Sequence, residues 1–224
     1  MRANLKTKLV AAASIGIVAF GVTACGDDSD TDDSTGTSSS ASAPKPVASI
    51  DAVTGKSTAI ALDAGFTDAL TALKLTPGVT GDGQLTDEGS LVFPITGGNV
   101  TVFEPGQVSP YVIGQLQHVD SGLTLTAGDT VVKLSNFNVD PGVSRVYGDV
   151  YVNGELAAAS AFLFQLDGRT LEPLAVEGSE AVLTGTKVEI SDVAAGVLND
   201  VFKTDAVKAG LLVGIATITV DVPA

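Results

Sequence analysis

Several residue types that carry protein chemistry are nearly absent from this chain of 224 residues. It contains no tryptophan, one cysteine, one methionine and one histidine. A single cysteine forms no disulfide within the chain, and one histidine cannot supply the three or four ligands of a usual zinc site. Acidic residues number 26 against 12 basic residues, which gives a net charge of −14. That charge repels nucleic acid, so we expect no nucleic-acid partner.

Motifs of the common enzyme classes are missing as well. The sequence has no Gly-x-Ser-x-Gly elbow and no glycine-rich phosphate loop followed by Lys and Ser or Thr. Acids are abundant, but no spacing singles out the pair that glycoside chemistry needs. We therefore expect a protein that works by binding and is not an enzyme, with no catalytic residue, no metal site and no cofactor.

The N-terminus has the pattern of a secretory signal peptide. Arg2, Lys6 and Lys8 precede an uncharged run over residues 9–21. Thirteen apolar residues are too few to cross a bilayer, which takes roughly 20, and they suit a signal-peptide core. Small residues follow this run, as cleavage by signal peptidases requires.

The only cysteine follows at a position that resembles the lipobox of bacterial lipoproteins. Val22, Thr23 and Ala24 lead directly into Cys25. The resemblance implies cleavage after a signal peptide of residues 1–24 and a diacylglyceryl group on Cys25. Two acyl chains hold a protein stably on a membrane without a transmembrane helix. We expect a lipid-anchored protein on the extracytoplasmic face of the cell membrane. The Ala, Thr, Val, Gly and Asp bias suggests a high-GC bacterium, and the lipoprotein resemblance is taken as actinobacterial.

Residues 25–46 combine the acylated cysteine with a linker. Five aspartates lie in the stretch 27–33 and are followed by Ser, Thr, Ala and Pro. This composition has no apolar periodicity and predicts a disordered, self-repelling spacer. A calcium loop would also need a glycine turn and a distal bidentate acid, which are absent here.

Residues 47–224 are predicted to form a single α+β domain. Helices are expected over residues 64–74, with Asp63 as N-cap, and over 192–202, with Ser191 as N-cap, because apolar residues recur there at helical spacing. Between them the pattern has period two and is punctuated by turns, of which Asn153-Gly154 is the strongest hairpin signal. Breaks are also expected at residues 120–122 and at Asn136. The expected fold is a mostly antiparallel β-sheet or sandwich, with the two amphipathic helices packed on one face or at one end.

The single histidine allows two interpretations. His118 ends an expected strand just before Asp120-Ser121-Gly122, where most histidines are surface or turn residues. The segment from Tyr111 through His118 to Gly122 and Leu123 also loosely resembles the haem-binding HtaA domain of actinobacterial cell surfaces, in which a strand runs into a His, Gly and Leu segment. That resemblance implies a haem ligand role for His118, with Tyr111 or Tyr147 nearby.

Three functions remain open. The first is a surface-exposed binding or structural module that contacts an envelope protein through sheet edges and loops. The second is a carrier of an apolar ligand such as a lipid, with the sheet curled around a cavity. Under that hypothesis the lining includes Phe93, Val100, Leu123, Phe162 and Phe164, although these side chains could equally fill a solid core. The third is haem binding at the cell surface.

Overall fold

Period-two alternation dominates the chain, and the computed structural model, which describes residues 43–222, folds most of it as strands. The strands are β1 (Ala48–Ile50), β2 (Ser57–Leu62), β3 (Thr76–Gly81), β4 (Gln84–Leu85), β5 (Ser90–Pro94), β6 (Gly97–Val102), β7 (Val112–Ala127), β8 (Thr130–Asp140), β9 (Arg145–Val152), β10 (Glu155–Asp167), β11 (Ala175–Glu177), β12 (Glu180–Ile190) and β13 (Leu212–Asp221). The helices are α1 (Ala64–Ala72) and α2 (Asp192–Phe202). The predicted signal peptide, Cys25 and nearly all of the linker lie outside the described residues.

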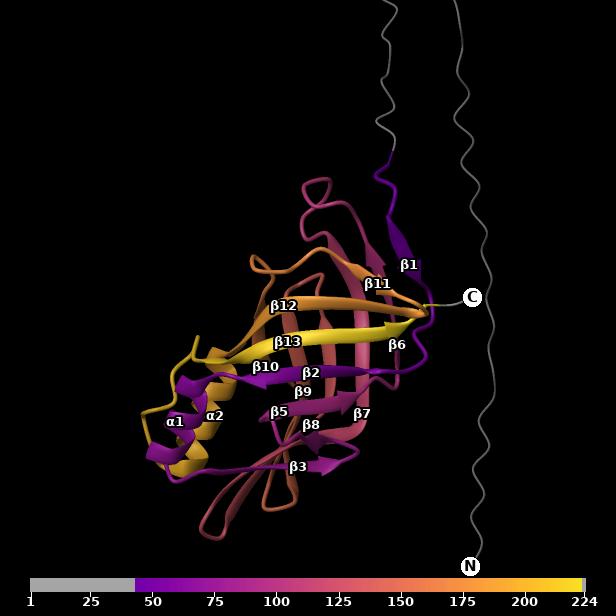
Figure 1. Cartoon of the computed structure of the whole chain (residues 1–224). Coiled ribbons are helices and arrows are strands. Elements are labelled where there is room, and N and C mark those ends of the chain that lie inside the picture. Colours follow the sequence, from indigo (N-terminus) through magenta and orange to yellow (C-terminus); the bar gives the residue numbers. More distant parts are fainter. Residues whose placement is uncertain (1–42, 223–224) are drawn as a thin grey trace, which may run out of the picture. The chain divides into compact units, whose positions relative to one another are not determined.

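All named strands belong to one antiparallel sheet with the order β1-β6-β7-β8-β9-β10-β12-β13-β2-β5-β4, while β11 pairs with β12 and β3 with β7. Figure 1 shows that the sheet curls strongly. Phe93 on β5 therefore packs edge-on against Phe137 on β8, with ring centroids 5.2 Å apart, although the two strands are far apart in the strand order. The prediction of a mostly antiparallel sheet was correct. Of the two predicted arrangements, a sheet or a sandwich, the chain adopts a single curled sheet.

Both helices lie at one end of the curled sheet (Figure 1), which is one of the two predicted placements. Asp63 caps α1 by accepting from the backbone N–H of Gly65 at 2.8 Å, and Ser191 caps α2 by accepting from that of Ala194 at 2.9 Å. Both caps and the span of α2 match the prediction, whereas α1 ends two residues earlier than expected. Among the described residues, neither helix has the length and apolar character needed to span a bilayer.

The longest strand, β7, passes straight through a predicted break. It changes partner along its length, from β6 at residues 112–117 to β3 at residues 121–126, and its register with β8 shifts between His118 and Gly122. Leu116 and His118 face the interior before the shift, and Leu123 and Leu125 face it afterwards. The expected turn at residues 120–122 is thus a β-bulge, which inserts extra residues and resets the alternation.

Neighbouring strands carry irregularities at the same level, and side chains join them. Asp120, Asn136 and Ser160 all have positive φ, between 49° and 57°. The Asn136 amide accepts from the Asp120 backbone N–H at 3.1 Å and donates to Asp149 at 2.9 Å. Asp149 also accepts from the Ser160 backbone N–H at 2.9 Å. We call these four residues, on β7, β8, β9 and β10, the bulge line.

Asp149 holds two donors of the bulge line, so its removal tests the contribution of this line to stability. We expect Asp149→Ala to lower the free energy of unfolding by about 1–2 kcal/mol, because one partly buried donor and one exposed donor lose their acceptor. Urea denaturation followed by circular dichroism measures the change. Asp200→Ala, at an exposed position of α2, is the matched control and should lose less than about 0.5 kcal/mol. Equal midpoints for the two variants would contradict a stabilising role.

Candidate functional site

The inner face of the curled sheet lines a partly open cavity of about 480 Å³. Its wall comes from strands on opposite sides of the sheet, through residues such as Ile60, Phe93, Leu116, Val146 and Val188. The lining is mostly apolar and contains a minority of polar groups, as in many small-molecule sites.

The volume of the cavity distinguishes a ligand site from a defect in core packing. An engineered cavity of about 150 Å³ takes up one benzene molecule. The present volume is roughly three times larger, so the cavity has room for a ligand well above the size of benzene. A side-chain-sized packing defect is far smaller than this, so the solid-core interpretation does not describe the interior.

Most of the residues predicted for a cavity do line it. Phe93, Val100, Leu123 and Phe164 contribute to the wall, and His118 and Tyr111 also border the space. Phe93 and Phe164 both pack against Phe137, whose ring lies 5.2 and 6.2 Å from theirs between centroids. The HtaA-like segment thus lies along the cavity, from Tyr111 to Leu123.

The prediction for Phe162 was wrong. Phe162 does not line the cavity; its ring lies 6.1 Å from that of Tyr147, and the guanidinium of Arg145 lies 4.5 Å above it. The reason is a register shift between Phe162 and Phe164, which separates two side chains that strict alternation would place on one face. Tyr147, the other suggested neighbour of a haem, lies with Phe162 outside the cavity.

His118 is a buried residue rather than a surface or turn residue, with only 1% of its area exposed. Its Nδ1 lies 3.3 Å from the carbonyl oxygen of Phe137, and its Nε2 lies 2.8 Å from the hydroxyl oxygen of Thr58. A carbonyl oxygen can only accept, so Nδ1 carries the proton. In the neutral ring Nε2 is then the acceptor, and the Thr58 hydroxyl donates to it.

Burial keeps this imidazole neutral. Desolvation lowers the pKa of His118 to about 4, and the hydrogen bond to the Phe137 carbonyl offsets only part of that effect. A hydroxyl on an imidazole is also the first contact of a nucleophile–base pair. Here the imidazole is a weak base at neutral pH, and its second nitrogen contacts a backbone carbonyl instead of a carboxylate.

Sequence reasoning missed Thr58. Threonine is common in strands, so its residue type carries no signal. Its position does carry one, because Thr58 alternates with Ile60 and both face the interior. An inward threonine on an otherwise apolar strand face requires a buried hydrogen-bond partner, which here is His118.

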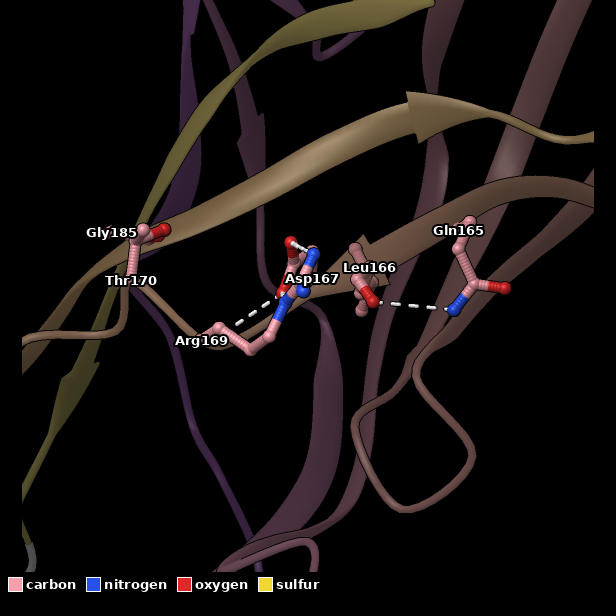
Figure 2. Close-up of polar contacts among 6 residues, drawn as sticks. All are labelled: Gln165, Leu166, Asp167, Arg169, Thr170 and Gly185. Atoms are coloured by element: carbon pink, nitrogen blue, oxygen red, sulfur yellow. Dashed lines mark hydrogen bonds and ion pairs between the residues drawn. The ribbon is translucent and has the colours of Figure 1, made fainter. Parts of the chain in front are cut away.

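The second polar region lies where the chain leaves β10, and Figure 2 shows its contacts. Arg169 donates to the Asp167 carboxylate through Nε at 2.9 Å and Nη2 at 2.7 Å, and its backbone N–H donates to the same group at 3.0 Å. The hydrogen bonds from Arg169 hold the pKa of Asp167 well below its usual range. The two charges thus balance each other at the cavity.

The segment 168–174, which we call the rim loop, begins directly after Asp167 and includes Arg169. The Thr170 hydroxyl donates to the Gly185 carbonyl at 2.7 Å, which ties the loop to β12 (Figure 2). A side chain at Gly185 would collide with the Thr170 carbonyl, and its φ of +106° also favours glycine. Leu171 and Leu174 from the loop pack with Val102, Val112 and Leu183. The rim loop therefore joins β12 to the β6–β7 side of the cavity.

Within residues 43–222, no group of three His, Cys, Asp or Glu side chains converges to hold a metal ion. Cys25, the predicted lipidation site, is outside this range. The arrangement that the described residues do provide is an apolar space with a self-satisfied His–Thr pair and a neutralised ion pair.

Protonation of His118 should weaken the fold in a defined pH window. Its folded pKa of about 4 lies below the ordinary value of 6.5, so the unfolded chain binds the proton first as pH falls. The contribution of neutral His118 to the free energy of unfolding is fully present above pH 6.5. It is lost as pH falls from 6.5 to 4, by up to about 3 kcal/mol.

Because His118 is the only histidine, its imidazole signals in an NMR titration report this pKa directly. The matched variant His118→Gln should lack the corresponding part of the pH dependence in urea unfolding. An imidazole that titrates near 6.5 in the folded protein would contradict burial of the neutral ring.

Comparison with known proteins finds no matching family model and no matching curated protein. Among solved structures, the C-terminal domain of HtaA from Corynebacterium glutamicum is similar, with a TM-score of 0.53 and 14% identity over 76% of this chain and 98% of that domain. The heme binding protein HtaB from the same organism matches with a TM-score of 0.45 and 11% identity, over 78% of this chain and 96% of its own. At these identities the first likeness concerns the fold, and the chain shares the fold of the HtaA C-terminal domain.

Proposed function

We propose that this protein is a binding protein of the cell envelope that takes an apolar small molecule into the cavity of its β-domain. The observation that carries the proposal is the cavity itself, an apolar space of about 480 Å³ inside the curled sheet. Natural ligand sites have volumes of about 300–1,000 Å³ and few polar groups, and this cavity has both properties. The protein acts by binding, without catalysis.

The lining defines the class of ligand. The Thr58–His118 pair satisfies its own hydrogen bonds, so it demands no polar partner from a ligand. Asp167 and Arg169 are the charged residues of the lining, and they neutralise each other. A hydrocarbon chain or an apolar ring system, with any polar end outside, meets these conditions.

The proposed location rests on the leader. The lipobox at Cys25 would hold the domain at the extracytoplasmic face of the cell membrane, and residues 26–46 would act as a spacer between the lipid and the domain. Such a place gives a carrier direct access to apolar molecules of the envelope. Mass spectrometry of the native N-terminus and of co-purified small molecules examines the anchor and the ligand together.

A bulky side chain inside the cavity should weaken binding. Val100 lines the cavity and is partly buried, so Val100→Trp fills part of the space. With the fluorescent 18-carbon probe cis-parinaric acid, we expect the variant to bind at least about tenfold more weakly than the wild type, a loss of about 1.4 kcal/mol. Fluorescence titration, with oleate as competitor, measures both affinities.

The matched control is Val193→Trp, the same change at an exposed position on α2. It should bind the probe like the wild type. Absence of competable binding by the wild type, or equal affinities of the two tryptophan variants, would contradict uptake into this cavity.

Haem is a second candidate, because the HtaA-like segment implies it. One feature of the cavity favours it: the Nδ1–H of His118 is fixed on a backbone carbonyl, as in many histidines that bind metals through Nε2. The Nε2 atom itself is not free, however, since it accepts from Thr58. The described residues therefore do not offer a ready iron ligand at this point of the cavity.

A further inference from the structure

We propose that Thr58 determines the ligand selectivity of the cavity: its hydroxyl covers the metal-binding nitrogen of His118, so that the site accepts an apolar ligand without recognising iron. This inference rests on the proposed function, because it concerns which apolar molecules enter the same cavity.

The ring of His118 is otherwise prepared for metal binding. A ligating histidine usually donates one ring N–H to a carbonyl or carboxylate, which fixes the tautomer and leaves the other nitrogen as the ligand. His118 has this arrangement, with Nδ1 on the Phe137 carbonyl at 3.3 Å and Nε2 on the side of Thr58. The neutral ring that burial enforces is also the form that ligates metals.

Thr58 occupies the position that an iron atom would need. Its hydroxyl oxygen lies 2.8 Å from Nε2, whereas metal–imidazole bonds are about 2.0–2.1 Å long. His118 and Thr58 are 1% and 5% exposed, so a metal has no open approach to the nitrogen. The hydroxyl therefore blocks ligation both by using the lone pair and by filling the space.

The backbone keeps Thr58 in place. It lies on β2, which pairs with β13 on one side and β5 on the other, so that Thr58 faces Ile218 and Phe93 in the register. A strand with both edges paired cannot shift outward without breaking two ladders of hydrogen bonds. Rotation of the side chain would leave Nε2 without its donor inside an apolar space, which is unfavourable.

The remaining lining residues offer one other side chain that ligates haem iron. Cysteine and methionine are absent from the described lining, and the tyrosine is Tyr111. Tyr111 packs against the cluster of Val102, Val112 and Leu183, as do Leu171 and Leu174 of the rim loop. Ligation of haem iron in this cavity would therefore have to use either His118, after displacement of Thr58, or Tyr111.

Two porphyrins that differ only in the metal test this inference. The probes are hemin and metal-free protoporphyrin IX, each titrated against the wild type and variants by absorbance, with displacement of cis-parinaric acid as the measure of entry into the cavity. For the wild type we expect affinities for the two porphyrins within about threefold of each other, and no Soret change that depends on His118.

Thr58→Ala removes the hydroxyl that covers Nε2, and Thr58→Ser keeps it. We expect the alanine variant to bind hemin at least about tenfold more tightly than the wild type, with the spectrum of an imidazole-ligated iron, and to bind metal-free porphyrin unchanged. The serine variant should behave like the wild type. The gain should disappear in the double variant Thr58→Ala, His118→Gln.

Three results would overturn the inference. The first is a wild-type preference for hemin of more than about tenfold that is lost in His118→Gln, and the second is such a preference lost in Tyr111→Phe. The third is identical hemin binding by the alanine and serine variants while both still bind cis-parinaric acid. If no probe enters the cavity of the wild type, the proposed function itself fails, and the selectivity inference fails with it.

Discussion

The interior of this protein depends on one constraint, the alignment of bulges across β7, β8, β9 and β10. Side chains alternate with period two along a strand, so each inserted residue exchanges the inner and outer faces beyond it. Without the irregularity after His118, strict alternation would place either His118 or Leu123 and Leu125 outside. The bulge line lets His118 and both leucines face the same cavity.

The bulge line is held by short polar side chains rather than by apolar packing. Asn136 connects the Asp120 backbone to Asp149, and Asp149 reaches on to the backbone of Ser160. Positive φ at a non-glycine residue is unfavourable, and asparagine and aspartate tolerate it best. Hydrogen bonds between neighbouring strands stabilise the conformations that the backbone alone would avoid, and they do so at the level where the sheet changes its register.

Sequence patterns predicted the parts of the fold that depend on local chemistry. The caps Asp63 and Ser191 and the Asn153-Gly154 turn were recognisable because each acts within a few residues. The bulges were mistaken for turns at residues 120–122 and at Asn136, because Asp, Ser, Asn and Gly favour both. What distinguishes a bulge from a turn is the continuing pairing with neighbouring strands, and that depends on residues far away in the chain.

The same limit explains which site residues could be found. Phe93 and Phe164 line the cavity, whereas Phe162 lies outside it because a register shift separates Phe162 from Phe164. The burial of His118 could not be foreseen from a segment that resembles a polar turn. Thr58 gave no signal by type, although its partner His118 is 60 residues away and only 2.8 Å distant.

The polar pair also explains how an apolar cavity can contain a histidine. A buried polar group is costly unless it is hydrogen-bonded, and the two groups here satisfy each other and one carbonyl. The charged residues at the rim loop follow the same rule, since Arg169 and Asp167 form a closed pair. The polar groups of these two pairs are thus already hydrogen-bonded, and apolar area and shape make up most of what the lining offers a ligand. Removal of one partner from such a pair would leave the other buried without a hydrogen bond, which is costly in an apolar site.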